Sequence, residues 1–142
     1  MTFLLDTNVV SEWIKPRPNR EVVTWLADVD EDRLFLSVIT LAQLRSGVAA
    51  MSPSRRRDQL DTWISVDLPD RFEGRLLSID PEVADRWGRI TGSARMAGRP
   101  IHAMDSFLAA TAIVHDLTIV TRNVSDFASS GVQIFCPWRS LH

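Results

Sequence analysis

Three aspartates and one glutamine stand at predicted strand ends or helix starts, where α/β proteins usually bind ligands. These residues are Asp6, Gln43, Asp105 and Asp126. Asp6 follows the apolar run 3–5 and precedes Thr7-Asn8, which places its carboxylate where a predicted strand meets a helix. In open α/β sheets, ligands bind outside the carboxyl ends of the strands. If the four side chains converge there, their oxygen atoms form a site suited to Mg²⁺ or Mn²⁺. A cation in such a site acts on phosphates.

Each of these residues also has an ordinary structural explanation. Asp6 fits a helix N-cap, because its side chain accepts hydrogen bonds from free backbone donors. An acid at Asp105, near the start of an Ala-rich helix, is favoured by the helix dipole. Asp126 fits a turn or a cap. Gln43 closes the segment 40–43, which has the form of a capping box in which the glutamine reaches back to the Thr40 amide.

Two further acids, Glu12 and Asp80, stand at comparable positions. We interpret Glu12 as part of the exposed face of the first helix. Asp80 precedes Pro81, so we interpret it as the cap of a helix with proline in its first turn. Both therefore rank below the four residues above as candidates for a site.

Short apolar runs alternate with segments of helical period, which predicts an α/β fold with a largely parallel five-stranded sheet flanked by helices. We place strands at 2–5, 34–37, 76–79, 118–121 and 132–135. Their runs are apolar rather than alternating, as expected for strands covered on both faces. We expect helices after Asn19, after Ser52-Pro53, from Asp80-Pro81 to Gly98, and from about Ala103 to His115.

The composition predicts one domain spanning residues 1–142, with 45% hydrophobic residues and a core of its own. A single cysteine, Cys136, excludes an intrachain disulfide and a Cys-rich zinc site, and three histidines make an imidazole site improbable. Asp6 interrupts the first apolar run, and the longest such stretch, 107–114, is too short to span a bilayer. We expect a soluble cytoplasmic protein without membrane contact.

A net charge of −2 argues against a uniformly basic surface for nucleic acid. Lys15 is the only lysine among the 16 basic residues, and arginine binds phosphate through a bidentate fork. Arg45 and the run Arg55-Arg56-Arg57 are thus candidates to guide RNA or DNA towards the acids. The stronger interpretation is that the run forms the solvated face of a helix.

Four ordered segments resemble the motifs of PIN-domain ribonucleases, specifically the VapC and FitB-like toxins of bacterial toxin–antitoxin modules. The resembling segments are Phe3-Leu4-Leu5-Asp6-Thr7-Asn8-Val9-Val10-Ser11-Glu12, residues 36–47, residues 103–112, and residues 117–123 continuing to Asp126-Phe127. The terminal Pro137-Trp138 is also similar to FitB-type members. The resemblance covers essentially the whole chain.

This resemblance implies a PIN fold in which acidic side chains hold one or two Mg²⁺ or Mn²⁺ ions and an activated water cleaves single-stranded or structured RNA. It implies Asp6 and Asp105 as principal metal ligands, with Asp126 completing the site through water or a second metal. Asn8, Thr121 and Asn123 would support the site, and His102 would be a loop residue rather than a general base. The implied partners are an RNA substrate, a cognate antitoxin, and a second copy of the chain in a homodimer and a toxin–antitoxin hetero-oligomer.

Position 43 departs from this family, because the second motif normally carries glutamate where the chain has Gln43. Either this member is naturally weakened, or the chain carries a deliberate inactivating change. Two hypotheses follow: a metal-dependent endoribonuclease toxin, and a catalytically silent module that binds RNA or antitoxin. A third, a phosphatase of the haloacid dehalogenase type, needs aspartate at position 8, where the chain has Asn8.

Overall fold

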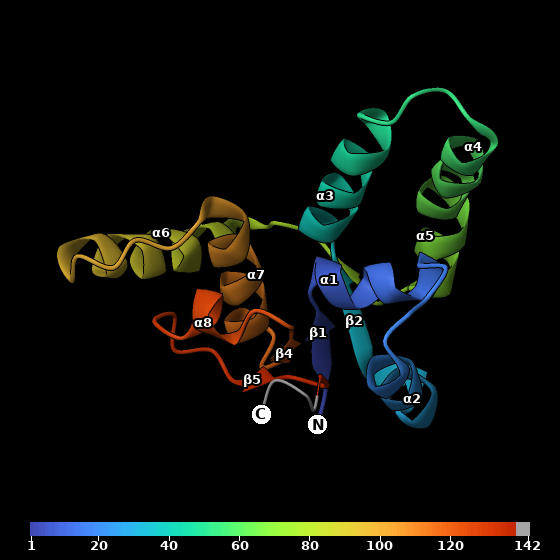
Figure 1. Ribbon diagram of the computed structural model, residues 1–142. Helices are drawn as coiled ribbons and strands as arrows, with labels where there is room; N and C mark the ends of the chain where they lie inside the picture. Colours follow the sequence, from blue (N-terminus) through green and yellow to red (C-terminus); the bar gives the residue numbers. More distant parts are fainter. Residues whose placement is uncertain (139–142) are drawn as a thin grey trace.

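A parallel sheet forms the centre of the protein, which a computed structural model describes for residues 1–138 (Figure 1). Its strands are β1 Phe3–Leu5, β2 Leu34–Ser37, β3 Leu76–Leu77, β4 Thr118–Val120 and β5 Ile134–Phe135. They lie in the order β3-β2-β1-β4-β5, and every neighbouring pair is parallel. The predicted α/β fold with a five-stranded sheet is confirmed. The strands are one to two residues shorter than predicted at several ends, because residues such as Thr121 and Ser78 already belong to the connections.

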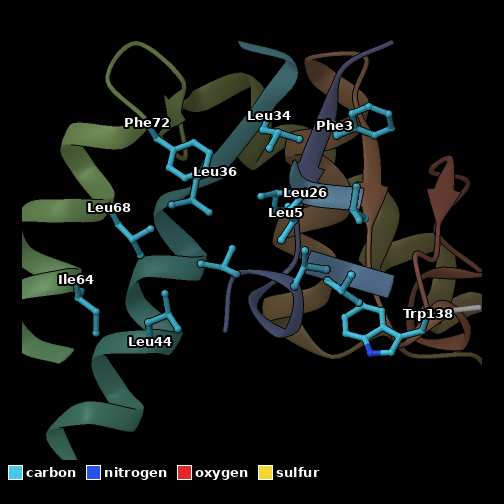
Figure 2. Close-up of a cluster of buried hydrophobic side chains, with 14 of the residues drawn as sticks. Phe3, Leu5, Leu26, Leu34, Leu36, Leu44, Ile64, Leu68, Phe72 and Trp138 are labelled. Atoms are coloured by element: carbon cyan, nitrogen blue, oxygen red, sulfur yellow. The ribbon is translucent and has the colours of Figure 1, made fainter. Parts of the chain in front are cut away.

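The sheet is covered on both faces because β1 sends alternate side chains to opposite sides. Phe3 and Leu5 belong to a core cluster that contains residues of α2 to α5, and Figure 2 shows Leu5 facing side chains from these elements. Leu4 belongs to a second cluster, with Leu108 of α7 and Ile119 of β4. The continuous apolar runs in the strands thus reflect burial on two faces, as predicted.

The connections between the strands are mostly helical. The α-helices are α1 Thr7–Val10, α2 Arg20–Asp28, α3 Val38–Ala49, α4 Arg55–Thr62, α5 Leu68–Arg71, α6 Pro81–Met96, α7 Ala103–Val114 and α8 Val124–Phe127. Short 3₁₀ segments at Ser11–Ile14 and Glu31–Arg33 and a π segment at Trp63–Asp67 complete the list. Figure 1 shows α3, α4 and α5 on one side of the sheet and α6, α7 and α8 on the other. Within residues 1–138, no helix has the length and apolar character needed to cross a membrane.

Most of the predicted helix starts agree with the structure. Asn19 caps α2 by accepting from the Val22 amide at 3.1 Å, and Asp80 caps α6 by accepting from the Val83 amide at 2.9 Å. The start predicted at Ser52-Pro53 is wrong. The Ser54 side chain is the cap of α4, where it accepts from the Arg57 amide at 3.0 Å, because the turn before it extends two residues further than expected.

Glu12 does not lie on an exposed helix face, so that interpretation was also wrong. Its side chain is only 2% exposed and forms an ion pair with Lys15. Its other oxygen accepts a hydrogen bond from the Asn19 amide at 2.6 Å. The buried carboxylate therefore holds the segment 15–19 against the 3₁₀ turn. This segment is not helical, so the periodicity of the sequence does not predict the contact.

The strand order places a topological switch at the centre of the sheet. The chain moves from β1 to β2 and β3 on one side, then returns to β4 on the other side of β1. Ligands bind at such a point, in the crevice outside the carboxyl ends of the strands. Asp6 follows β1 and Thr121 follows β4, so these two residues face each other at the switch.

Candidate active site

Asp6 is held in a fixed orientation at the end of β1. Its backbone amide continues the sheet by donating to the Val120 carbonyl at 2.9 Å, and its side chain is only 7% exposed. One carboxylate oxygen caps α1 by accepting from the Thr7 amide at 2.7 Å. The other accepts from the Thr121 hydroxyl at 2.7 Å and from the Asn8 side chain at 3.2 Å. Asp6 is thus an N-cap and a residue of the switch crevice at the same time.

Asn8, Thr121 and Asn123 form a network that joins the ends of β1 and β4. The Asn8 amide group donates to Asp6 and to the Thr121 hydroxyl oxygen, while its carbonyl accepts from the Arg122 amide at 3.2 Å. The Asn123 backbone amide donates to the Thr121 oxygen at 3.0 Å. The Thr121 hydroxyl proton points to Asp6, so its lone pairs receive the other two donors. These bonds fix which way the Asp6 carboxylate faces.

Gln43 reaches the same place from α3. The Thr7 hydroxyl donates to its side-chain oxygen, and the Thr7 backbone amide donates to the Asp6 carboxylate, so Thr7 connects the two residues. The capping-box interpretation was wrong. Helix α3 has Ser37 rather than Thr40 as its cap, and the Gln43 side-chain oxygen accepts from the Thr7 hydroxyl. Gln43 is half-buried and faces the end of β1.

Asp105 and Asp126 come from two helices at this end of the sheet. Asp105 is in the first turn of α7, the helix that leads into β4, and Asp126 is in the first turn of α8, which follows β4. Both line a pocket of about 430 Å³. His102 also lines it. As predicted, it lies in the loop before α7, and it caps that helix, because its Nδ1 accepts from the Met104 amide at 3.3 Å.

The three aspartates interact electrostatically. Burial raises the pKa of Asp6 above the ordinary value of 3.8, against the hydrogen bonds from Thr121, Thr7 and Asn8, and the charge of Asp126 raises it further. Burial also raises the pKa of Asp105, followed by the charges of Asp6 and Asp126, while His102 acts in the opposite direction. The carboxylates therefore lie close enough to disfavour one another's ionisation.

Such a cluster suits a divalent cation chemically, because hard cations prefer carboxylate oxygens and relieve repulsion between them. The Asp6 oxygen that accepts only from Thr7 keeps a lone pair for a ligand. Within the described part of the chain, however, no three or more His, Cys, Asp or Glu side chains are grouped closely enough to hold an ion as they stand. Metal binding by Asp6, Asp105 and Asp126 therefore remains a prediction.

The arginines named from the sequence lie elsewhere. Arg45 is engaged by Asp61 and Ser65, and Arg56 donates to the Ile14 carbonyl. Neither residue lines the pocket beside Asp105. Arg99, which was not among the predicted site residues, does line this pocket. The signal available was the helix stop at Gly98-Arg99-Pro100, only six residues before Asp105.

Comparison with known proteins gives consistent matches over most of the chain. A model of the PIN domain family matches residues 3–129. Toxin FitB of Neisseria gonorrhoeae is 39% identical over 135 residues, which is 95% of this chain and 97% of FitB. VapC ribonuclease Y4jK of Sinorhizobium fredii is 35% identical over 135 residues, covering 95% and 96% of the two chains.

Solved structures agree with these matches. The crystal structure of FitAcB from Neisseria gonorrhoeae contains a chain with a TM-score of 0.91 and 38% identity, over 97% of this chain and 99% of that one. A structure of FitAB bound to an IR36 DNA fragment gives a TM-score of 0.90 and 37% identity, over 97% and 96%. The likeness therefore extends over the sheet and both groups of helices.

Proposed function

Because the chain belongs to the PIN domain family, we propose that it is a Mg²⁺- or Mn²⁺-dependent endoribonuclease toxin of a toxin–antitoxin module whose activity is lowered by Gln43. The observation that carries the proposal is the placement of three aspartates at the carboxyl end of the sheet: Asp6 caps α1 directly after β1, and Asp105 and Asp126, in the first turns of α7 and α8, line one pocket. The charges of Asp6 and Asp126 raise the pKa of Asp105, and the charge of Asp126 raises that of Asp6. Groups with perturbed pKa values in a pocket mark functional sites. The names of the relatives Toxin FitB and VapC ribonuclease Y4jK support the assignment to a toxin ribonuclease.

Asp6, Asp105 and Asp126 would hold the cation in this proposal. A divalent cation in such a site neutralises negative charge on the phosphate oxygens and makes water a stronger nucleophile. The protein's own part is orientation. Thr121 and Asn8 hold one Asp6 oxygen, and the Thr7 amide holds the other. Outer contacts of this kind commonly determine metal affinity, because they fix the ligand and tune its basicity.

Gln43 supplies an oxygen but no charge to this arrangement. Its side-chain oxygen already accepts from the Thr7 hydroxyl, and an amide has no basic function at neutral pH. Glutamate at position 43 would keep the Thr7 contact and add one negative charge beside Asp6. We infer that the chain binds the cation more weakly than a relative with glutamate at this position.

The partners follow from the same proposal. The similar solved structures FitAcB and FitAB with DNA support an antitoxin as the physiological partner and a hetero-oligomer as the resting state. We further propose a homodimer within that assembly and a cytoplasmic location, where RNA is available. A second candidate function, a binding module without cleavage activity, is favoured by Gln43 alone.

Substitution of Gln43 tests the proposal directly. Cleavage of RNA by Gln43→Glu in Mg²⁺ or Mn²⁺ should exceed that of the unchanged chain by orders of magnitude, each factor of ten being about 1.4 kcal/mol of transition-state stabilisation. EDTA should abolish cleavage. Gln59→Glu, on the exposed face of α4, makes the same chemical change outside the site and should have no effect. Equal cleavage by Gln43→Glu and the unchanged chain, with both folded, would remove position 43 from the site, whereas cleavage by neither protein would favour the binding module.

A further inference from the structure

The pocket lined by Asp105 and Asp126 is also lined by two basic residues. Its wall includes Arg99 and His102 from the segment that connects α6 to α7. Figure 1 shows this segment leaving the far end of α6 and running back to the start of α7. Its remaining lining residues are Pro100, Ile101, Ser125, Ala128 and Ser129. The carboxylates alone would repel the phosphates of a polynucleotide, and the two basic residues can offset this repulsion.

The backbone of Arg99 is fixed by the way α6 ends. Gly98 has a φ of +69°, the Gly98 amide donates to the Arg95 carbonyl at 3.0 Å, and the Arg99 amide donates to the Ala94 carbonyl at 2.8 Å. These two bonds form a Schellman motif, in which a left-handed glycine closes the helix. Pro100 follows and restricts the chain further. Arg99 is therefore positioned by a rigid turn rather than by a mobile loop.

The Arg99 guanidinium is uncommitted. Its side chain is exposed, and among residues 1–138 no hydrogen bond or ion pair engages it. This contrasts with Arg45, Arg71 and Arg89, each of which pairs with an acid. Arginine donates in a planar fork that matches two phosphate oxygens, so a free guanidinium on a pocket wall suits a phosphodiester.

His102 presents a second donor on the same wall. Because its Nδ1 accepts from the Met104 amide, the proton of the neutral ring is on Nε2. The ring lies close enough to Asp105 to affect the pKa of that carboxyl group, and both residues line the pocket. A strand bound in the pocket would therefore meet Arg99 and His102 as well as Asp105 and Asp126.

We propose that Arg99 and the Nε2–H of His102 bind the phosphate backbone of the RNA strand beside the cleavage site. This inference rests on the proposed ribonuclease function and names the residues that hold its substrate. Phosphate contacts of this kind set the position and register of the strand and carry no sequence information. They also offset the repulsion between RNA and the Asp105–Asp126 wall.

Binding of a short fluorescein-labelled single-stranded RNA, measured by anisotropy in Mn²⁺ with RNA integrity checked on a gel, tests this role. Arg99→Gln should weaken binding roughly three- to tenfold and reduce the slope of log affinity against log salt by about 0.7, the loss of one phosphate contact on a single strand. Arg99→Lys should retain the salt slope with reduced affinity, because it keeps the charge but loses the fork. His102→Ala should weaken binding by a smaller factor.

Arg95→Gln is the matched control. It removes the same charge from the last turn of α6, yet Arg95 does not line the pocket, so RNA affinity should be unchanged. Melting temperatures of the two variants should agree, since the Schellman bonds use only backbone atoms. Equal RNA affinity of Arg99→Gln and Arg95→Gln would overturn the inference and leave the ribonuclease proposal standing. Failure of the unchanged chain to bind RNA, with no cleavage by Gln43→Glu, would overturn both.

Discussion

Asp6 combines two roles that a sequence presents as alternatives. Its carboxylate caps α1, and the same group faces Thr121 and Asn8 across the switch crevice. Capping uses one oxygen, whereas the crevice contacts use the other. Capping of α1 is therefore compatible with ligand binding by Asp6, because the cap fixes the orientation of the carboxylate.

Thr121→Val should lower the affinity for Mn²⁺ roughly ten- to hundredfold by removing the hydroxyl that orients Asp6. The hydrogen bond from Thr121 lowers the pKa of Asp6, so its loss raises that pKa further and disfavours the charged form that binds a cation. Isothermal titration with Mn²⁺ measures the change. Thr118→Val, in the strand β4 that precedes Thr121, removes a hydroxyl that donates to Gln133 instead and should leave Mn²⁺ affinity unaltered. If both variants bind equally well, Thr121 has no part in orienting Asp6.

Asp105→Asn should remove Mn²⁺ binding and leave the metal-free melting temperature unchanged or higher. The charge of Asp105 is disfavoured by burial and by Asp6 and Asp126, so its removal relieves repulsion. Asp67→Asn, an exposed acid in the π segment, serves as the control. Differential scanning fluorimetry in EDTA and in Mn²⁺ gives both quantities. Clear destabilisation of Asp105→Asn in EDTA would instead indicate a purely structural role at the start of α7.

At the scale of elements, helix ends position the site. The first turns of α1, α7 and α8 lie at the carboxyl edge of the sheet, where α3 also begins directly after β2. In a parallel sheet every connecting helix runs back across the sheet, so helix starts gather at the edge where strands end. Side chains in these first turns, including Asp105 and Asp126, therefore converge without being close in sequence.

The end of α6 offers a test at this scale. Gly98→Ala should destabilise the protein by about 1–2 kcal/mol, because φ of +69° is unfavourable for a residue with a Cβ atom. Gly92→Ala, inside the same helix, should stabilise it by roughly 0.5–1 kcal/mol, since alanine loses less backbone entropy there. A Cβ atom at either position has no neighbouring atom within 4 Å, so the two substitutions differ in backbone conformation and not in steric clashes. Urea unfolding should give opposite signs, and equal signs would contradict the Schellman assignment.

At the scale of the whole molecule, folding and the proposed cation site are linked through pH. Asp6 and Asp105 have folded pKa values above the ordinary 3.8. Each therefore contributes stability that is fully present below the unfolded pKa and is lost as the pH rises through the folded pKa. Near neutral pH both carboxyl groups are ionised, so the metal-free protein has lost this stability in full. A cation that binds only the folded, ionised site would increase the free energy of unfolding at that pH.

Saturating Mn²⁺ should accordingly stabilise the protein most at neutral pH and progressively less as the pH falls through the raised pKa values. At a free concentration one hundred times the dissociation constant, the gain at neutral pH is about 2.7 kcal/mol. Unfolding by urea at several pH values, with Mn²⁺ or EDTA, measures it. The same series on Asp105→Asn supplies the baseline without the site. A Mn²⁺ effect independent of pH would show that the ion binds elsewhere.

Sequence alone determined the five strands along the chain and the helices α2, α4, α6 and α7. Apolar runs such as 3–5 and 118–120 are continuous because these strands are buried on both faces, and caps such as Asn19 and Asp80 act within three residues, so both signals are local. The ordered motifs also identified the family resemblance and singled out Gln43. These features could be read directly because each depends on neighbouring residues.

Only the tertiary structure determined which side chains from distant parts of the sequence are in contact. Contacts such as Thr7 with Gln43 and Thr121 with Asp6 join residues 36 and 115 positions apart, so no periodicity reports them. Glu12 was misjudged for the same reason, since its burial depends on how the segment after the 3₁₀ turn folds back onto it. Carboxyl pKa values likewise depend on burial and through-space charge, which only the folded chain defines.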